Sequence, residues 1–162
     1  RSDMAFSTAD LWDAHHAEIG VIDAQFRGFG LRRSFSGPCV TVKTPGDHRQ
    51  VRALAVMPGE GRVIVVDGGS LMQVALLGDR IATAAMANGW AGIVALGAIR
   101  DSAAIDALNF GVKALGTIAR RAETEVGGET DIDLTLGRVK VRSGDWIYAD
   151  PDAVVVSPRR LA

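Results

Sequence analysis

The sequence predicts a mixed α/β fold in which parallel strands with crossover helices are followed by antiparallel strands. Between residues 62 and 118, short aliphatic runs alternate with helical patterns, which favours parallel strands joined by right-handed crossovers. Between residues 131 and 158, apolar and polar residues alternate with a period of two, which is typical of antiparallel hairpins. No linker, repeat or low-complexity run divides the 162 residues, so we expect a single domain over 1–162.

Local signals place the individual elements. Ser7 or Thr8 is suited to cap a short helix, and Gly89 suits the position just after a later one. In chain order we expect a helix over 8–15, a strand over 39–44, a helix over 47–57, a strand over 63–66, a helix between Gly78 and Gly89, a strand over 92–96, a short helix from Ser102 and a strand over 111–118. The antiparallel tail should turn at 136–138, 143–145 and 150–152.

The composition is that of an ordinary globular protein. A formal net charge of −1 gives no global attraction to nucleic acid or to an anionic membrane, and Arg120–Arg121 is expected to be solvated surface. No run approaches the ~18 apolar residues of a membrane span, and no signal peptide is visible, so we expect a cytoplasmic protein. The single cysteine, Cys39, is expected to be buried and inert. Met4 is expected to be the natural start, with residues 1–3 as a remnant of expression.

The first candidate site is the start of the helix after Gly78. Asp79, Arg80 and Ile81 occupy its first turn, where backbone N–H groups are free and the helix dipole favours an anion. Glycine lets a small carboxylate approach the backbone closely. The alternative is structural, because Asp79 could simply complement the dipole of the helix.

The second candidate site is the pair Arg100-Asp101, which follows the strand over 92–96. Loops at the carboxyl ends of parallel strands often hold ligands in α/β proteins. Arg100 offers a planar fork for a carboxylate, and Asp101 offers a hard oxygen to Mg²⁺ or Mn²⁺. The structural alternative is that Asp101 caps the following helix while Arg100 forms a salt bridge.

Together, the two candidate sites predict a ligand site more specifically than either does alone. One helix and one strand of a crossover separate Asp79 from Arg100, so both sites can face one pocket. The helix start and Arg100 would hold a carboxylate, while Asp101, with Asp79 through water, would hold a divalent cation. This arrangement suits a small 2-oxo acid, because a metal that polarises the keto group stabilises the enolate of aldol cleavage or decarboxylation.

Several stretches resemble the RraA-like family over nearly the whole chain: VVDGGS, ALLGDRIA, NGWAGIVALGAIRD, GVKALGT and GDWIYADPDAVVVSP. That family includes the regulator of ribonuclease E activity A and the class II 4-hydroxy-4-methyl-2-oxoglutarate/4-carboxy-4-hydroxy-2-oxoadipate aldolases, which also decarboxylate oxaloacetate. The aldolase members share an Asp followed, after a gap of twenty residues, by Arg-Asp. This chain has that motif as Asp79, Arg100 and Asp101.

The resemblance implies a fold, an assembly and residue roles. The fold would be a compact α/β/β sandwich that assembles as a homotrimer or hexamer. Gly78–Ile81 and Arg100 would bind the pyruvyl group, Asp101 would bind Mg²⁺ or Mn²⁺ directly, and Asp79 would bind it through a water that shuttles the proton. The regulator from enteric bacteria lacks the acidic residue after the arginine, so Asp101 favours the enzyme. The alternative function is a non-catalytic regulator that binds and inhibits ribonuclease E.

The chain departs from the family pattern at two places. Many members carry an acidic residue three positions after the aspartate, where this chain has Ala104 and its nearest acid is Asp106. Many also carry Glu-Asp-Asn after the first long strand, where this chain reads Pro45-Gly46-Asp47-His48. Substrate contacts are therefore expected to differ there.

Other chemistry has weaker support. The lysines are Lys43, Lys113 and Lys140; no feature near Lys113 indicates a lowered pKa, so a Schiff-base aldolase fits poorly. The three histidines lack partners at zinc-ligand spacing. Residues 125–129 are either a mobile loop that closes over a site or a plain surface turn.

Overall fold

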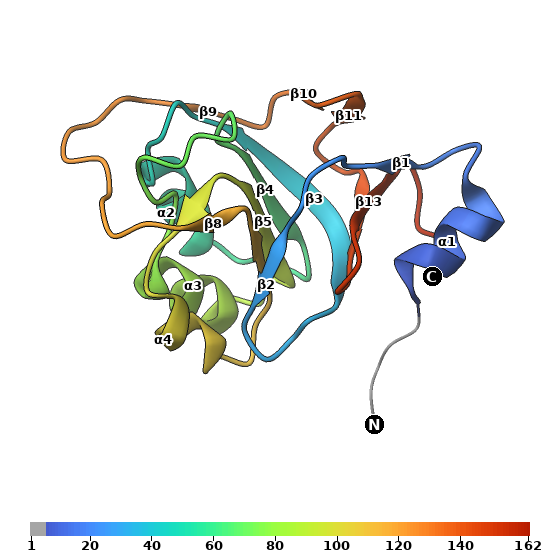
Figure 1. The fold of residues 1–162 in the computed structure, drawn as a ribbon, viewed down its shortest axis with the longest axis horizontal. Helices are drawn as coiled ribbons and strands as arrows, with labels where there is room; N and C mark the ends of the chain where they lie inside the picture. The colour runs from blue at the N-terminus through green and yellow to red at the C-terminus, as the bar shows by residue number, and fades with distance from the viewer. Residues whose placement is uncertain (1–5) are drawn as a thin grey trace.

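The computed structural model describes residues 6–162, and its central parallel sheet confirms the first prediction (Figure 1). Four strands are parallel neighbours in this order: β3 (Phe35–Lys43), β4 (Val63–Asp67), β5 (Gly92–Leu96) and β7 (Val112–Ala114). Strand β2 (Arg27–Phe29) pairs antiparallel with β7 and was not expected from the sequence.

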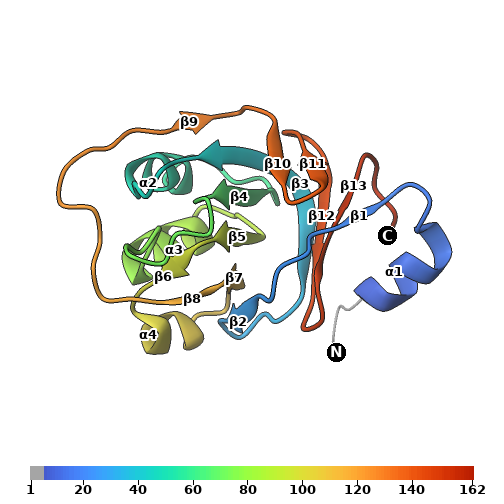
Figure 2. The ribbon, with the colours of Figure 1, turned by 45° about the horizontal axis from the view of Figure 1, so that its top comes forward.

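The crossover helices lie together on one face of this sheet (Figure 2): α2 (Arg49–Ala55), α3 (Asp79–Ala87) and α4 (Ser102–Asp106). Strand β4 is apolar on both faces because a layer covers each of them. Ile64 and Val66 pack with the helices, whereas Val63 and Val65 pack on the opposite side. This two-sided burial explains the near-continuous aliphatic run in the sequence.

The second layer is antiparallel, as predicted for the tail. It consists of β1 (Gly20–Val21), β10 (Leu134–Leu136), β11 (Val139–Val141), β12 (Trp146–Ala149) and β13 (Val154–Ser157). Strand β3 belongs to both layers, because residues 35–38 pair antiparallel with β12 and residues 39–43 pair parallel with β4. The strand therefore begins four residues before the expected 39–44. Together with the helices, the two β layers form the expected α/β/β sandwich (Figure 2).

The segment expected as one strand over 111–118 is two strands. Strand β7 ends at Ala114, and β8 (Gly116–Thr117) pairs in parallel with β6 (Ala98–Ile99) instead of with β5. A similar break at Gly97 separates β5 from β6. The two breaks lie side by side, because Leu115 N–H donates to the carbonyl of Gly97 at 2.9 Å. In this small sheet β6 ends at Ile99, so Arg100 follows it directly.

Helix α1 (Thr8–His15) covers the outside of the antiparallel layer, and its predicted range is confirmed. Ser7 is the N-cap, because its hydroxyl accepts the N–H of Asp10 at 3.1 Å. The buried carboxylate of Asp150 accepts both the N–H and the hydroxyl of Thr8 at 2.7 Å, which ties the helix to the β12–β13 turn. Within residues 6–162, no helix is long and apolar enough to cross a membrane. The expected start at Met4 and the remnant over 1–3 lie outside the described residues.

Candidate active site

Backbone hydrogen bonds bring the two candidate sites side by side. Leu76 N–H donates to the carbonyl of Ala98 at 2.8 Å, and Arg100 N–H donates to the carbonyl of Leu77 at 3.0 Å. The segment that enters α3 therefore runs beside the segment that leaves β6. As a result, the start of α3 faces Arg100 and Asp101, which is the convergence that the crossover predicts.

The side chain of Asp101 joins the two segments. Its Oδ2 accepts the backbone N–H of Asp79 at 3.1 Å, so the carboxylate sits at the positive end of α3. Asp101 holds the N-cap position of α4, but its side chain makes no capping hydrogen bond there. The structural alternative, in which Asp101 caps its own helix, is therefore wrong.

The backbone of Asp101 is in the left-handed region, with φ 59° and ψ 39°. A non-glycine residue in a sparsely populated region costs about 1–3 kcal/mol, and such residues cluster at functional sites. Asp tolerates this region better than most residue types because its short side chain can bond locally. Here the conformation turns the carboxylate away from α4 and toward α3.

Gly78 leaves the space that this carboxylate occupies. A Cβ atom at residue 78 would lie 2.5 Å from Oδ2 of Asp101 and 3.2 Å from Cγ of Arg100. The φ of −137° at Gly78 is open to any residue type, so close approach, not backbone conformation, favours glycine here.

The first turn of α3 keeps two donors for a ligand. Ala82 N–H is the first to bond backward, to the carbonyl of Gly78 at 3.1 Å. Because Asp101 already takes the N–H of Asp79, the N–H groups of Arg80 and Ile81 have no acceptor within residues 6–162 and can donate to a ligand. A small carboxylate fits such a helix start.

Arg100 is not locked in a tight ion pair. Its Nε lies 3.9 Å from Oδ2 of Asp101, and the two side chains are 36% and 41% exposed. Its Nη1 also donates to the carbonyl of Ala119 at 3.4 Å. These long contacts leave most of the guanidinium donors available to a ligand.

A cavity of about 590 Å³ lies beside these groups. Every residue predicted for the site lines it: Gly78, Asp79, Arg80, Ile81, Arg100 and Asp101. Its remaining lining residues were not predicted: His48, Arg52, Ala75, Leu77 and Arg121. The available signal was the departure from the family pattern over 45–48, of which His48 lines the cavity.

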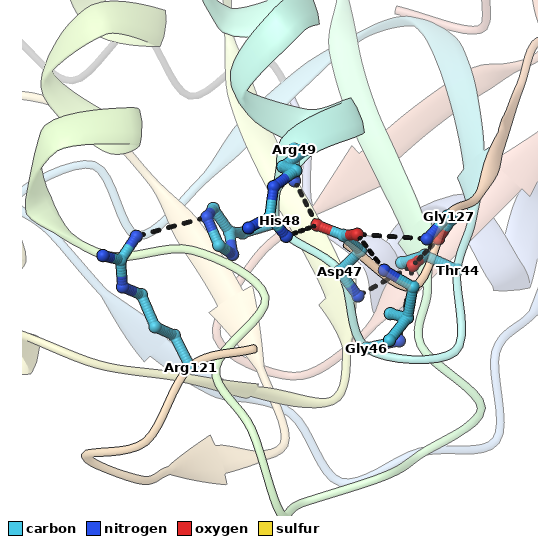
Figure 3. A network of polar contacts seen from close by, with 8 residues as sticks. Thr44, Gly46, Asp47, His48, Arg49, Arg121 and Gly127 are labelled. Atoms are coloured by element: carbon cyan, nitrogen blue, oxygen red, sulfur yellow. Dashed lines mark hydrogen bonds and ion pairs between the residues drawn. The ribbon is translucent and has the colours of Figure 1, made fainter. Parts of the chain in front are cut away.

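We call His48, Arg52 and Arg121 the second wall of the cavity. Asp47 does not line the cavity, but it precedes His48 and forms a network of polar contacts with Arg49 and Gly127 (Figure 3). Its fully buried carboxylate accepts the N–H groups of Arg49, Val126 and Gly127 at 3.0, 2.7 and 3.1 Å, and the Arg49 guanidinium at 2.9 Å. Burial alone would raise the pKa of Asp47, but these hydrogen bonds outweigh it and hold the pKa well below its ordinary value. The segment over 125–129 is therefore anchored at its centre to the start of α2.

His48 presents a neutral ring to the cavity wall. Burial lowers its pKa, and the charges of Arg49 and Arg121 lower it further. Its Nε2 lies 3.4 Å from Nη1 of Arg121 (Figure 3). Because a guanidinium only donates, Nε2 is the acceptor and the ring proton is on Nδ1. That buried Nδ1 has no hydrogen-bond partner among the described residues.

The donor set suits a hydrated divalent cation. Magnesium usually takes one or two carboxylates and keeps several waters. Asp101 and Asp79 can supply these carboxylates at the cavity edge. Within residues 6–162, no cluster of three or more His, Cys, Asp or Glu side chains could hold a metal ion.

Other reactive groups lie away from the cavity lining. Lys113 is 3% exposed and burial lowers its pKa, which corrects the expectation of an ordinary lysine. Cys39 is buried as predicted, and burial raises its pKa to about 12. Asp106, the acid nearest to Ala104, accepts the N–H of Gly30 and lies 3.6 Å from Arg33. It therefore supports β2 and supplies nothing to the cavity.

The protein is an α/β/β sandwich with a cavity at the exits of its parallel strands. Arginines outnumber carboxylates in the lining of this cavity. The model of the RraA-like family, described as Aldolase/RraA, matches residues 8–156, and the chain belongs to this family. A relative from Alkalilimnicola ehrlichii is 44% identical over 158 residues and 98% of each chain. One from Halorhodospira halophila is 44% identical over 98% of this chain and 99% of its own. Both carry the provisional name 4-hydroxy-4-methyl-2-oxoglutarate aldolase.

Two solved structures share the whole fold. One, from Geobacillus kaustophilus, is described as an S-adenosylmethionine:2-dimethylmenaquinone methyltransferase; it is 42% identical with a TM-score of 0.93, over 96% of this chain and 97% of its own. The other, the RNA-processing inhibitor RraA from Thermus thermophilus, is 33% identical with a TM-score of 0.92, over 98% and 96%. Because these descriptions differ on one fold, function has to be argued from the site.

The Gly78 contact predicts a non-additive pair of variants. Gly78→Ala should lower the free energy of unfolding by about 1–3 kcal/mol, because the added methyl group collides with the Asp101 carboxylate. In an Asp101→Ala background the same change should cost clearly less, since the colliding oxygen is gone. Urea unfolding of all four proteins measures this difference, and an equal cost in both backgrounds would contradict the contact.

The Asp47 network predicts a pH-dependent loss of stability. Asp47→Asn should lower the free energy of unfolding by about 1–3 kcal/mol at neutral pH, because charge-assisted bonds are lost. The matched control is Asp23→Asn, which breaks an exposed pair with Arg138 and should cost less than about 1 kcal/mol.

The pKa of Asp47 is lowered by folding, so its stabilisation is present above its unfolded pKa and is lost as pH falls. The difference between wild type and Asp47→Asn should therefore shrink below about pH 4. A difference that stays constant from pH 7 to pH 3 would show that the charge of Asp47 does not matter.

Proposed function

We propose that the protein is a lyase, a divalent-metal-dependent class II aldolase that releases pyruvate. Its substrates would be 4-hydroxy-4-methyl-2-oxoglutarate and 4-carboxy-4-hydroxy-2-oxoadipate, and it would also decarboxylate oxaloacetate. Family membership and the aldolase name of the 44% identical relatives support the proposal. The observation that carries it is the meeting of the α3 start, Arg100 and Asp101 at one cavity.

Three groups would hold the pyruvyl end of the substrate. The N–H groups of Arg80 and Ile81 would donate to its carboxylate, and Arg100 would add a planar pair of donors. Gly78 would let the carboxylate lie close to the backbone. These contacts would fix the 2-oxo acid before the reaction and so lower the entropy cost of reaching the transition state.

Asp101 would bind Mg²⁺ or Mn²⁺ directly, and Asp79 would bind it through water. The cation, when bound, would supply Lewis-acid polarisation of the keto group. The bond between Oδ2 of Asp101 and the N–H of Asp79 would orient the carboxylate for this task.

Asp79 would also assist the proton transfer from the C4 hydroxyl of the substrate. In aldol cleavage the C4 hydroxyl loses its proton and its oxygen forms a C=O bond to C4, which becomes the keto carbon of the second product. The C3–C4 bond breaks, and its electron pair becomes the enolate of pyruvate. C3 then takes a proton to give pyruvate. Asp79 lines the cavity beside Arg100 and would orient the water that accepts the hydroxyl proton.

The assembly and location form part of the same proposal. The family resemblance supports a homotrimer or hexamer, and large apolar side chains such as Leu31 and Val126 are exposed in the single chain. Burial of such side chains between subunits would stabilise an oligomer. We place the enzyme in the cytoplasm, with no direct nucleic-acid or membrane partner, in agreement with its near-neutral charge.

The second candidate function is a regulator that binds and inhibits ribonuclease E. The favouring observation is the 33% identity to the Thermus thermophilus protein described as an RNA-processing inhibitor. That function predicts binding to ribonuclease E that Asp101→Asn leaves unchanged, together with no metal-dependent release of pyruvate.

Removal of the metal tests the proposed chemistry. Pyruvate release from 4-hydroxy-4-methyl-2-oxoglutarate and from oxaloacetate should disappear in EDTA and return when excess Mg²⁺ is added. Asp101→Asn should lower kcat/KM at least about 100-fold, because the cation loses its direct ligand.

The matched control for Asp101→Asn is Asp131→Asn. Asp131 is also exposed and also has a left-handed backbone, with φ 64°, but it does not line the cavity. It should keep activity within about twofold of wild type, because surface changes have small effects. Turnover that persists in EDTA, or equal losses in the two variants, would refute the proposal.

A further inference from the structure

The cavity has a second wall whose charge the proposed chemistry does not use. This wall consists of His48, Arg52 and Arg121. The proposed pyruvyl and metal contacts use other lining residues, 78–81 and 100–101. Among the residues that the structure describes, neither Arg52 nor Arg121 forms an ion pair. Two uncompensated guanidinium groups in one cavity wall attract an anion.

The charge of the whole cavity also favours an anionic ligand. Its lining contains four arginines but only two carboxylates, Asp79 and Asp101. If those two carboxylates hold a divalent cation, they no longer compensate the arginines. Arg52 and Arg121 are exposed, and a single carboxylate at Arg100 would leave both without an ion pair, whereas a second carboxylate on the substrate would pair with them.

His48 fixes Arg121 at this wall. Its pKa is lowered, so the ring stays neutral and Nε2 can accept from Nη1 of Arg121. This tautomer leaves a buried Nδ1–H without a partner in the described part of the chain, which costs stability. Such a cost is understandable where the ring orients a side chain for binding. The Asp47 network holds the start of α2 beside the anchored 126–127 segment, and Arg121 faces His48 there (Figure 3).

The size of the cavity also exceeds the needs of a pyruvyl group. A volume of about 590 Å³ lies within the range of sites for whole small molecules. Space therefore remains for a substrate whose distal end reaches the second wall. Binding energy from that end could position the bond that breaks.

We propose that Arg52 and Arg121, the latter oriented by His48, bind a second carboxylate of the substrate and are the residues by which the enzyme selects 2-oxo acids with more than one carboxylate over monocarboxylic ones. This assignment rests on the proposed function, because it takes the pyruvyl carboxylate to lie at Arg100. Arg52 and Arg121 are specificity-determining residues, and His48 is a positioning residue that acts through Arg121.

A matched pair of ligands tests the assignment. 2-Oxoglutarate and 2-oxopentanoate have the same chain length and differ in the second carboxylate. Isothermal titration of the full chain with saturating Mg²⁺ should give at least tenfold tighter binding of 2-oxoglutarate. Arg52→Gln and Arg121→Gln should each weaken that binding about tenfold, as expected for a charged hydrogen bond, and should change 2-oxopentanoate affinity less than twofold.

Control variants separate this role from general effects. Arg138→Gln removes one positive charge from an 89% exposed side chain and should keep the ligand preference. His48→Asn retains a side-chain acceptor for Arg121 and should keep most of the preference, whereas His48→Phe should lose it. Urea unfolding checks that each variant folds, and the ratio of the two affinities is insensitive to a partly unfolded fraction.

The outcomes distinguish this assignment from the proposed function. Equal affinity of wild type for the two ligands, or equal losses for both in Arg121→Gln, overturns the assignment even if pyruvate is released in the activity assay. A preference that depends on both arginines, without any release of pyruvate, supports the assignment and refutes the aldolase. Failure of both ligands to bind wild type refutes the two proposals together.

Discussion

The hydrogen bond from Asp79 N–H to Oδ2 of Asp101 is the interaction on which the site depends. It joins the start of α3 to the exit of β6, two segments that the backbone bonds of residues 76–77 already hold together. It also fixes the direction of the Asp101 side chain, toward α3 instead of α4. A carboxylate that caps α4 would leave Arg100 alone at the cavity, whereas a carboxylate turned to α3 creates an acidic edge beside a helix start that is suited to bind a carboxylate.

The same arrangement explains two features that look unfavourable when viewed alone. The left-handed backbone of Asp101 costs free energy, yet it is the conformation that turns the side chain toward α3. The glycine at residue 78 places no side chain where that carboxylate lies. On the other wall, the unpaired Nδ1 of His48 accompanies the contact that holds Arg121. In each case a local cost accompanies a group held at the cavity.

Much of this organisation could be predicted from the sequence. Aliphatic periodicity located the parallel strands and the helices, and the twenty-residue gap between Asp79 and Arg100 predicted that they converge. Periodicity failed where strands change partners. Residues 35–38 contain Gly37 and Pro38, which suggest a turn, but Gly37 is needed because a Cβ there would lie 2.1 Å from the carbonyl oxygen of Gly61.

The second cavity wall could not be predicted from local patterns. His48 and Arg121 are 73 residues apart, and no crossover links them as one links Asp79 to Arg100. Next to His48, the buried carboxylate of Asp47 accepts the N–H groups of Val126 and Gly127, a few residues after Arg121 in the chain. The sequence marked Arg121 as solvated surface, and the residue is exposed, but nothing nearby in the chain indicated that it also borders a cavity. The departure at His48 was visible, but its consequence required the structure.

The most direct measurement is a crystal structure of the protein with Mn²⁺ and oxalate, which mimics the enolate of pyruvate. The account predicts an anomalous manganese peak bonded to Asp101, with oxalate on the N–H groups of Arg80 and Ile81 and on Arg100. Manganese bound away from Asp101, or an Asp101 side chain turned to cap α4 while oxalate lies elsewhere, would contradict it.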